Sequence, residues 1–246
     1  MKITSLQNNL IKLYASLKLK KNRDLHRLFL LEGIDLLLEA KANNLVKTIL
    51  YVDEIPLEIE CVEYIEVTPE IIKKISTQVT PGKFIAICNF MQDNDKKSNR
   101  VIALDGVQDP GNGGTILRSA IAFGFEEILL SKDSFDIYND KFLRASKGAV
   151  FNINIKRVDL VEELKLRLNE GYQVLSTSVV DSTSYDDFEY QNKVCLVLGN
   201  EGQGISKDVF DISTHKIHIP MSEKMESLNV GVAGSIIMSK IFISSK

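Results

Sequence analysis

The stretch that decides the fold reads Ile217-His218-Ile219-Pro220-Met221 and then, after residues 222–226, Ser227-Leu228-Asn229-Val230-Gly231-Val232-Ala233-Gly234-Ser235. It predicts a short apolar strand, a polar loop and a helix. Pro220 has no backbone N–H and ends the strand, and Ser227 and Asn229 can cap the helix. From Val230 onward the side chains are small or apolar, so a neighbouring backbone can come close. We therefore expect a buried chain end, unlike most termini.

The length and charge of the chain limit the number of domains and the kinds of partner that it can have. Its 246 residues fit two domains. The net charge of −3 indicates no partner, but residues 1–27 carry seven Lys or Arg against one Asp, which is seven minus one, or +6. Such a cluster can attract phosphates or can be a solvated helix face. The cations that we select as candidate phosphate contacts are Lys18, Lys20, Lys21 and Arg23.

Cysteine usage and hydropathy indicate the compartment. Cys61, Cys88 and Cys195 each lie in an apolar run, their number is odd, and no CxxC occurs. We expect buried free thiols in a reducing environment. The sequence has no apolar signal-peptide core, and no apolar run approaches the roughly 18 residues of a membrane span. These features predict a soluble, cytoplasmic protein.

Residues 1–91 alternate between strand and helix patterns, which predicts a small α/β domain. Helical spacing occurs in residues 10–17 and 32–42 and again after Pro69. The expected strands are residues 28–31, 48–52, 61–67 and 84–90. Residues 92–99 contain no apolar side chain and predict a linker to a second domain at residues 100–246.

The second domain opens with an apolar strand at residues 101–104, a glycine-rich loop at 106–114 and a helix at 115–123. This order is typical of a phosphate or nucleotide cradle. However, GxGxxG would need glycine at Ile116, and no GxxxxGK[ST] occurs. Residues 142–148 predict a small-residue turn. The wholly apolar residues 194–198 are typical of a parallel strand buried on both faces.

Three loops, residues 106–114, 199–206 and 220–229, each follow a strand of this sheet. The carboxyl ends of parallel strands share one edge, where open α/β sheets bind ligands, so the loops are expected to meet. Their polar side chains and those of the adjoining helix are Asn112, Arg118, Glu201, Ser227 and Asn229. No His, Cys and Asp residues have the spacing of a metal site. We interpret His215 and His218 as strand residues.

Three segments carry a family likeness: Asp109-Pro110-Gly111-Asn112-Gly113-Gly114-Thr115-Ile116-Leu117-Arg118-Ser119-Ala120, Leu196-Val197-Leu198-Gly199-Asn200-Glu201-Gly202-Gln203-Gly204-Ile205, and residues 217–221 with 227–230. Together they resemble the three motifs of the SpoU (TrmH-type) RNA ribose methyltransferases of the SPOUT class. Residues 1–90 resemble the substrate-binding domain that many members carry. Gly113 is a departure, because members often have Ile or Val there, and we expect it to change little.

The resemblance implies a small N-terminal α/β RNA-binding domain and a C-terminal α/β SPOUT domain with a parallel sheet and a deep trefoil knot, an exception to the unknotted rule. It implies S-adenosylmethionine as cofactor and a homodimer formed through the C-terminal domain. The cofactor is expected at the backbone of Gly199, Ile219 and Leu228, with Glu201, Gly202 and Met221 beside it.

The implied reaction is an attack of an RNA 2′-oxygen on the sulfonium methyl, in which the protein orients the reactants and helps to remove the hydroxyl proton. The family assigns Arg118 the central role. We favour a phosphate holder over a base, because a guanidinium stays charged. Asn112 is expected to orient Arg118 or the ribose, and Glu201 to hold a partner arginine or to shape its loop. Ser227 and Asn229 are expected to fix the pocket.

Ribosomal RNA is the expected substrate, with tRNA as the alternative, and the cations of residues 12–27 are expected to contact its phosphates. Three other interpretations stay open. They are a knotted relative that binds without turnover, a nucleotide-dependent α/β enzyme of another class, and methylation of a base. The intact motif residues argue against the first and the failed glycine patterns against the second. The Ser-Leu-Asn segment, with Asn112 and Arg118, favours ribose over base.

Overall fold

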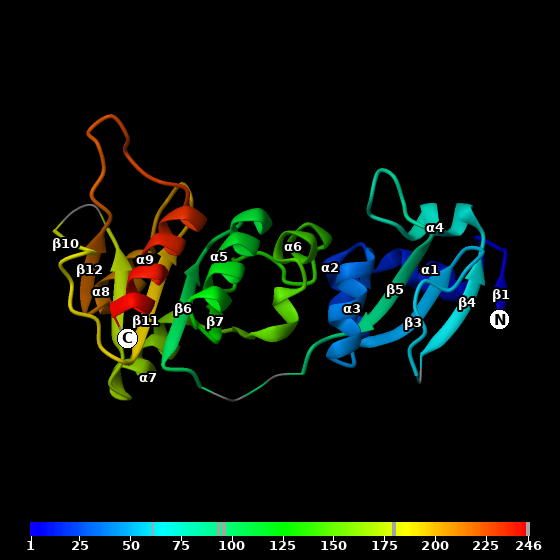
Figure 1. Cartoon of the computed structure of the whole chain (residues 1–246), viewed down its shortest axis with the longest axis horizontal. Coiled ribbons are helices and arrows are strands. Elements are labelled where there is room, and N and C mark those ends of the chain that lie inside the picture. The colour runs from blue at the N-terminus through cyan, green and yellow to red at the C-terminus, as the bar shows by residue number, and fades with distance from the viewer. Residues whose placement is uncertain (61, 93, 95–96, 179–180, 245–246) are drawn as a thin grey trace. The chain divides into compact units, whose positions relative to one another are not determined.

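The computed structural model describes residues 1–246 except 61, 93, 95–96, 179–180 and 245–246. Cys61 and part of the predicted linker therefore lie outside the described residues. The chain divides into two compact α/β units (Figure 1). Unit 1 comprises Met1–Gln92 and Asp136–Phe151, and unit 2 comprises Asp93–Phe135 and Asn152–Lys246. Residues 136–151 thus belong to unit 1, although unit 2 flanks them in the sequence.

Unit 1 is built on a mixed sheet in the order β1-β4-β3-β5-β2. Its strands are β1 (Lys2–Ile3), β2 (Leu28–Leu31), β3 (Val46–Tyr51), β4 (Glu63–Val67) and β5 (Phe84–Asn89). Its helices are α1 (Asn9–Ser16), α2 (Lys20–His26), α3 (Ile34–Ala42), α4 (Pro69–Ile75), α6 (Asp140–Ser146) and the 3-10 helix η1 (Ala149–Asn152). The predicted small α/β domain is confirmed.

Amphipathic helices close the core of unit 1. Ile11 and Tyr14 of α1 and Ile71 and Ile75 of α4 pack with apolar side chains of the sheet such as Ile65. The turn predicted at residues 142–148 is wrong. These residues lie mostly in α6, because Asn139 caps that helix by accepting from Lys141, and the helix ends where Lys147 adopts a left-handed conformation with φ of 49°.

Unit 2 is built on a seven-stranded sheet in the order β10-β12-β9-β11-β6-β7-β8, and its strand pairs are all parallel. The strands are β6 (Arg100–Asp105), β7 (Glu127–Leu130), β8 (Asn154–Arg157), β9 (Gln173–Thr177), β10 (Thr183–Ser184), β11 (Val194–Gly199) and β12 (His215–His218). The helices are α5 (Pro110–Ala122), α7 (Leu160–Asn169), α8 (Lys207–Ile212) and α9 (Val230–Ser244). The predicted parallel sheet is confirmed.

Both faces of this sheet are covered, which explains the unbroken apolar run in β11. Cys195 and Val197 pack with α7 and α8, and Leu196 and Leu198, on the opposite face, lie toward α5 and α9. Figure 1 shows α5 and α9 side by side. A Cβ at Gly234 would lie 2.6 Å from Cδ1 of Leu198, so α9 packs as closely as its small residues predict.

The strand order decides where the site lies. β12, β9, β11 and β6 are neighbours, and they end at His218, Thr177, Gly199 and Asp105. The loops that follow these strands therefore start from one edge of the sheet, as expected. The topology adds a fourth loop after β9, of which residues 179–180 are outside the described part of the chain.

Candidate functional site at the carboxyl edge of the sheet

The glycine-rich segment after β6 is mostly helix. We expected a loop at residues 106–114, but α5 begins at Pro110. Asp109 caps it, because its Oδ1 accepts from the amides of Gly111 (2.7 Å) and Asn112 (3.1 Å), and proline suits the first helical position. This cap places Asn112 on the first turn of α5, at the sheet edge.

A chain of side-chain amides joins the three motifs. Nδ2 of Asn229 donates to Oδ1 of Asn112 at 2.9 Å, and Nδ2 of Asn112 donates to Oε1 of Glu201 at 2.8 Å. These residues come from the start of α9, the start of α5 and the loop after β11. Three of the five predicted polar residues are thus in direct contact. Asn112 uses both ends of its amide here, and neither bond goes to Arg118.

Glu201 also shapes the turn before α5. Its carboxylate accepts from the amides of Gln108 (3.4 Å) and Asp109 (3.3 Å). Partial burial acts to raise the pKa of Glu201, but the hydrogen bonds from Asn112 and from these amides outweigh burial and hold the pKa below its usual value of 4.5. The carboxylate is therefore ionised at neutral pH.

Asn200 is a structural residue that the sequence interpretation missed. Its Oδ1 accepts from Gly202 and Gln203, its Nδ2 donates 2.7 Å to the carbonyl of Gly106, and its backbone pairs with Gly204. An Asn two residues before a glycine is a common turn signal that could have indicated it. Gly199 precedes this turn, and a Cβ there would lie 2.3 Å from the carbonyl carbon of Gly204. The turn therefore requires glycine.

Arg118 and Ser227 are the two predicted polar residues outside the amide chain. Arg118 lies on α5 and is exposed, and within the described residues it makes no hydrogen bond or ion pair. An unengaged guanidinium is available for a phosphate. Ser227 is also exposed. It does not cap α9, because Asn229 does so by accepting from Gly231 (2.9 Å) and Val232 (3.3 Å).

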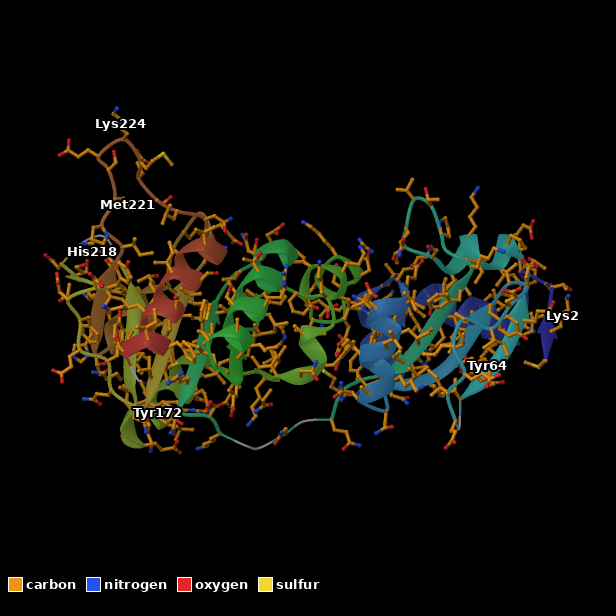
Figure 2. The ribbon with its side chains drawn as sticks, viewed as in Figure 1. Lys2, Tyr64, Tyr172, His218, Met221 and Lys224 are labelled. Atoms are coloured by element: carbon orange, nitrogen blue, oxygen red, sulfur yellow. The ribbon has the colours of Figure 1, made fainter. Side chains whose placement is uncertain are left out.

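The positions expected to hold a cofactor lie around a loop that projects from the sheet edge. Figure 2 shows His218 at the end of β12, Met221 along the loop and Lys224 near its tip. Ile219, Met221 and Leu228 are half-buried, whereas Glu201 and Gly202 are exposed. The fit to S-adenosylmethionine is chemical: backbone groups at the ends of β11 and β12 suit its neutral nucleoside part, and a side chain at Gly202 would meet only Asn200, at 3.6 Å, so the backbone of Gly202 is accessible.

The cations selected in unit 1 fall into two groups. Lys18, Lys20 and Lys21 are exposed at the start of α2. Arg23 is buried: its Nη1 donates to the carbonyls of Leu17 and Lys18, both at 2.8 Å, and its Nη2 pairs with Asp136 at 2.5 Å. Its guanidinium therefore binds the backbone between α1 and α2. We therefore leave Arg23 out of the proposed phosphate contacts.

In the described part of the chain, no three His, Cys, Asp or Glu residues gather as a metal site would need. Over the same residues, no helix combines the length and the apolar character that crossing a bilayer requires. Cys88 and Cys195 are buried free thiols, and burial raises the pKa of the Cys195 thiol to about 12.

Comparison with known proteins identifies the family. Residues 99–239 match the SpoU rRNA Methylase family, and residues 8–86 match the MRM3-like substrate binding domain. The chain is 32% identical to the 23S rRNA (guanosine(2553)-2′-O)-methyltransferase RlmP of Bacillus subtilis, over 96% of this chain and 97% of that protein.

Solved structures agree with the sequence match. An S-adenosylmethionine-bound rRNA methyltransferase from Sinorhizobium meliloti superposes with a TM-score of 0.86 at 28% identity, over 98% of this chain and 97% of that one. An RNA 2′-O ribose methyltransferase superposes with a TM-score of 0.82 at 25% identity, over 100% and 99%. The chain belongs to the SpoU family of S-adenosylmethionine-dependent RNA 2′-O-ribose methyltransferases.

Proposed function

We propose that this protein methylates the 2′-hydroxyl of a ribose in ribosomal RNA. The observation that carries the proposal is the amide chain Asn229–Asn112–Glu201, which ties the three family motifs together. Arg118, on the same helix as Asn112, makes no hydrogen bond or ion pair with the residues that the structure describes. Ribosomal RNA is chosen over tRNA because the B. subtilis relative, named as a 23S rRNA enzyme, matches along almost its whole length.

The side chains take separate roles in this proposal. S-adenosylmethionine supplies an electrophilic methyl group when bound, held by backbone groups of Gly199, Ile219 and Leu228 beside Glu201, Gly202 and Met221. Arg118 holds the phosphate next to the target ribose, and its positive charge favours loss of the hydroxyl proton. Asn112 and Asn229 hold the starts of α5 and α9 in register, and Glu201 fixes the turn before α5. Ser227 contacts the substrate from the exposed loop.

Binding of the RNA begins at unit 1 in this proposal. Lys18, Lys20 and Lys21 are exposed cations on one short segment, as a phosphate-binding surface needs. Chemistry on the 2′-hydroxyl itself explains a choice of RNA over DNA. Free cysteines and an RNA substrate fit a cytoplasmic protein.

The proposal includes a homodimer formed through unit 2. Val232 and Ile243 of α9 and Ile121 of α5 expose large apolar side chains, Ile243 to 64%. Apolar residues gathered on two adjacent helices favour a second copy as their cover. Ile243→Glu is expected to shift the protein toward monomer in sedimentation velocity, whereas Ile55→Glu, at an exposed isoleucine of unit 1, leaves its mass unchanged. A dimer in both variants would contradict this interface.

The trefoil knot also stays a prediction. β12 lies two strands from β11, and α9 returns to pack on β11 and α5. Residues 219–229 therefore cross the sheet edge between these elements, which is the path that a C-terminal knot needs.

The test of the reaction uses methyl-labelled S-adenosylmethionine with separate pools of unmodified rRNA and tRNA. After digestion, the label is expected in a 2′-O-methylnucleoside from rRNA. Arg118→Ala is expected to lower the rate by about 100-fold or more and to leave cofactor binding within a few fold, whereas Lys207→Ala, at an exposed lysine of α8, has no effect. Label found only in tRNA would show that the substrate is tRNA and not rRNA. Label found on a base would show that the enzyme methylates a base and not a ribose. Bound cofactor with no label in either RNA would show that the protein is a relative that binds without turnover.

A further inference from the structure

A short loop after β7 supports the turn that leads into α5. In residues 131–135, the hydroxyl of Ser131 accepts from the amide of Gly106 at 2.9 Å, and the amide of Phe135 donates to the carbonyl of Val107 at 2.9 Å. The Ser134 hydroxyl donates to the carbonyl of Leu104 at 3.0 Å. The loop therefore fixes the backbone at the end of β6 and just before Asp109.

Arg157, the last residue of β8, holds this loop from its other side. Its Nη1 donates to the carbonyls of Ser131 (2.6 Å), Lys132 (3.0 Å) and Ser134 (3.1 Å), and its Nη2 donates to that of Phe135 (2.6 Å). A guanidinium offers its donors in a rigid planar fork, which lysine cannot imitate. Because four backbone carbonyls of the loop accept from this one side chain, the whole loop is fixed.

The ring of Phe135 carries this support to α5. Phe135 as a whole is 7% exposed, and its ring occupies the space beside Gly113 that a side chain there would need. A Cβ built on Gly113 would lie 2.4 Å from Cε1, 2.5 Å from Cζ and 2.9 Å from Cδ1 of the ring. Only glycine leaves room for the ring. Gly113 is also the residue directly after Asn112, whose two hydrogen bonds join the motifs.

We propose that residues 131–135, clamped by Arg157, form a buttress that positions Asn112 through the packing of Phe135 on Gly113. Phe135 and Arg157 are positioning residues, since they act on the reaction through Asn112. The activity readout of this inference rests on the proposed function. A misplacement of about 1 Å at such a site can lower a rate by about 100-fold, so the packing at Gly113 matters for chemistry as well as stability.

The test is a double-mutant cycle in the full chain. Gly113→Val is expected to lower kcat by about 100-fold while S-adenosylmethionine affinity stays within about threefold. Phe135→Ala alone is expected to lower kcat by about tenfold, because the first turn of α5 loses its support. The double variant is expected to recover to within about fivefold of wild type, since the valine fills the space that the ring leaves. A double variant no faster than Gly113→Val would overturn the inference.

If Gly113→Val fails to fold, a smaller substitution and a measurement of amide exchange still test the inference. Gly113→Ala adds a single carbon and takes the place of Gly113→Val in the double-mutant cycle with Phe135→Ala. Amide hydrogen exchange at Gly111 and Asn112, whose N–H groups bond to Asp109, is expected to become about tenfold faster in Phe135→Ala and in Arg157→Lys. The control is Phe125→Leu, which alters a buried ring after the far end of α5 and leaves these two amides protected. Unchanged exchange in both Phe135→Ala and Arg157→Lys would overturn the buttress.

These readouts separate the two proposals. Wild-type protein that methylates no RNA would contradict the proposed function, and the exchange rates would still decide whether residues 131–135 support Asn112. Active wild-type protein without coupling between residues 113 and 135 would contradict the buttress alone.

Discussion

Asn229 donates a hydrogen bond from its side-chain amide to Oδ1 of Asn112, across 117 positions of the chain. The other end of the same amide caps α9 by accepting from Gly231 and Val232. One side chain thus stabilises a helix with its oxygen and links two motifs with its nitrogen. The capping of α9 and the bond to Asn112 can be separated by replacing Asn229 with aspartate, which keeps an acceptor oxygen and loses the donor.

Asn229→Asp is expected to keep the stability of the protein and to lose activity. An aspartate caps a helix about as well as asparagine, whereas alanine costs roughly 1 kcal/mol of unfolding free energy. Both variants remove the donor to Asn112, so both are expected to lower kcat by about tenfold or more. Thermal unfolding and single-turnover methylation measure the two effects. An Asp variant with wild-type activity would mean that the bond to Asn112 has no role in the reaction.

Gly199→Ala is expected to disrupt the second motif. Its Cβ would lie 2.3 Å from the carbonyl carbon of Gly204 and 2.4 Å from the amide nitrogen of Ile205, and backbone atoms cannot move aside as a side-chain tip can. We expect a loss of about 2 to 4 kcal/mol in unfolding free energy and no measurable cofactor binding in calorimetry.

Gly202→Ala is the matched control for this substitution. It lies in the same turn, but its Cβ would meet only the Asn200 side chain at 3.6 Å, an ordinary contact. Stability within about 0.5 kcal/mol of wild type is expected. If both variants lose stability equally, the turn is sensitive to any added carbon and the close approach at Gly199 is not the cause.

Glu201→Gln is expected to change how stability depends on pH. Hydrogen bonds hold the folded pKa of Glu201 below the usual value of 4.5, so its stabilising contribution is fully present above that value and is lost as the pH falls through the lower folded pKa. The difference in unfolding free energy between wild type and variant is therefore expected to be constant from about pH 8 to 6 and to shrink below about pH 4.5. Urea unfolding at several pH values measures it. A difference that grows on acidification would show that the folded pKa is raised.

The sequence predicted the site well where a motif lies directly after a strand. Continuous apolar runs such as residues 194–198 predicted a doubly covered parallel sheet, and a parallel sheet places the loops after its strands on one edge. That argument alone brought Asn112, Glu201 and Asn229 together, as the structure confirms. The roles of Arg118 and Ser227 remain predictions.

The differences between the sequence prediction and the structure have both local and tertiary causes. α5 starts at Pro110 because Asp109 caps it, although three glycines within residues 110–115 disfavour helix. Gly113 was expected to change little, yet it makes room for Phe135, 22 residues away, and no periodicity predicts that pair. Arg23 was taken for a phosphate contact because the sequence shows its charge and not its burial against Asp136. For Gly113 and Arg23 a tertiary contact decides the role of the residue, whereas the Asp109 cap is a local signal that the sequence contains.

The contrast between Arg23 and its neighbouring lysines gives the last prediction. Arg23→Met leaves the carboxylate of Asp136 buried without its partner, and breaking such a pair costs about 3 kcal/mol or more. Adding Asp136→Leu is expected to restore part of that loss, because no unpaired charge remains. Replacing Lys18, Lys20 and Lys21 together by Gln is expected to change stability by less than about 1 kcal/mol, since all three are exposed and Lys20 forms only a surface pair with Asp24.

For RNA binding we expect the reverse: the triple Lys variant is affected, and the Arg23 variant is not. The triple Lys variant loses phosphate contacts, so the slope of log affinity against log salt is expected to fall by about 2 for unmodified rRNA. The pair-replaced variant Arg23→Met with Asp136→Leu keeps the three lysines, and its slope is expected to match that of wild type. Anisotropy titrations between about 50 and 200 mM salt measure both. A slope that falls in the Arg23 variant and not in the triple Lys variant would mean that Arg23 leaves Asp136 to bind phosphate, and that the exposed lysines are a solvated helix face.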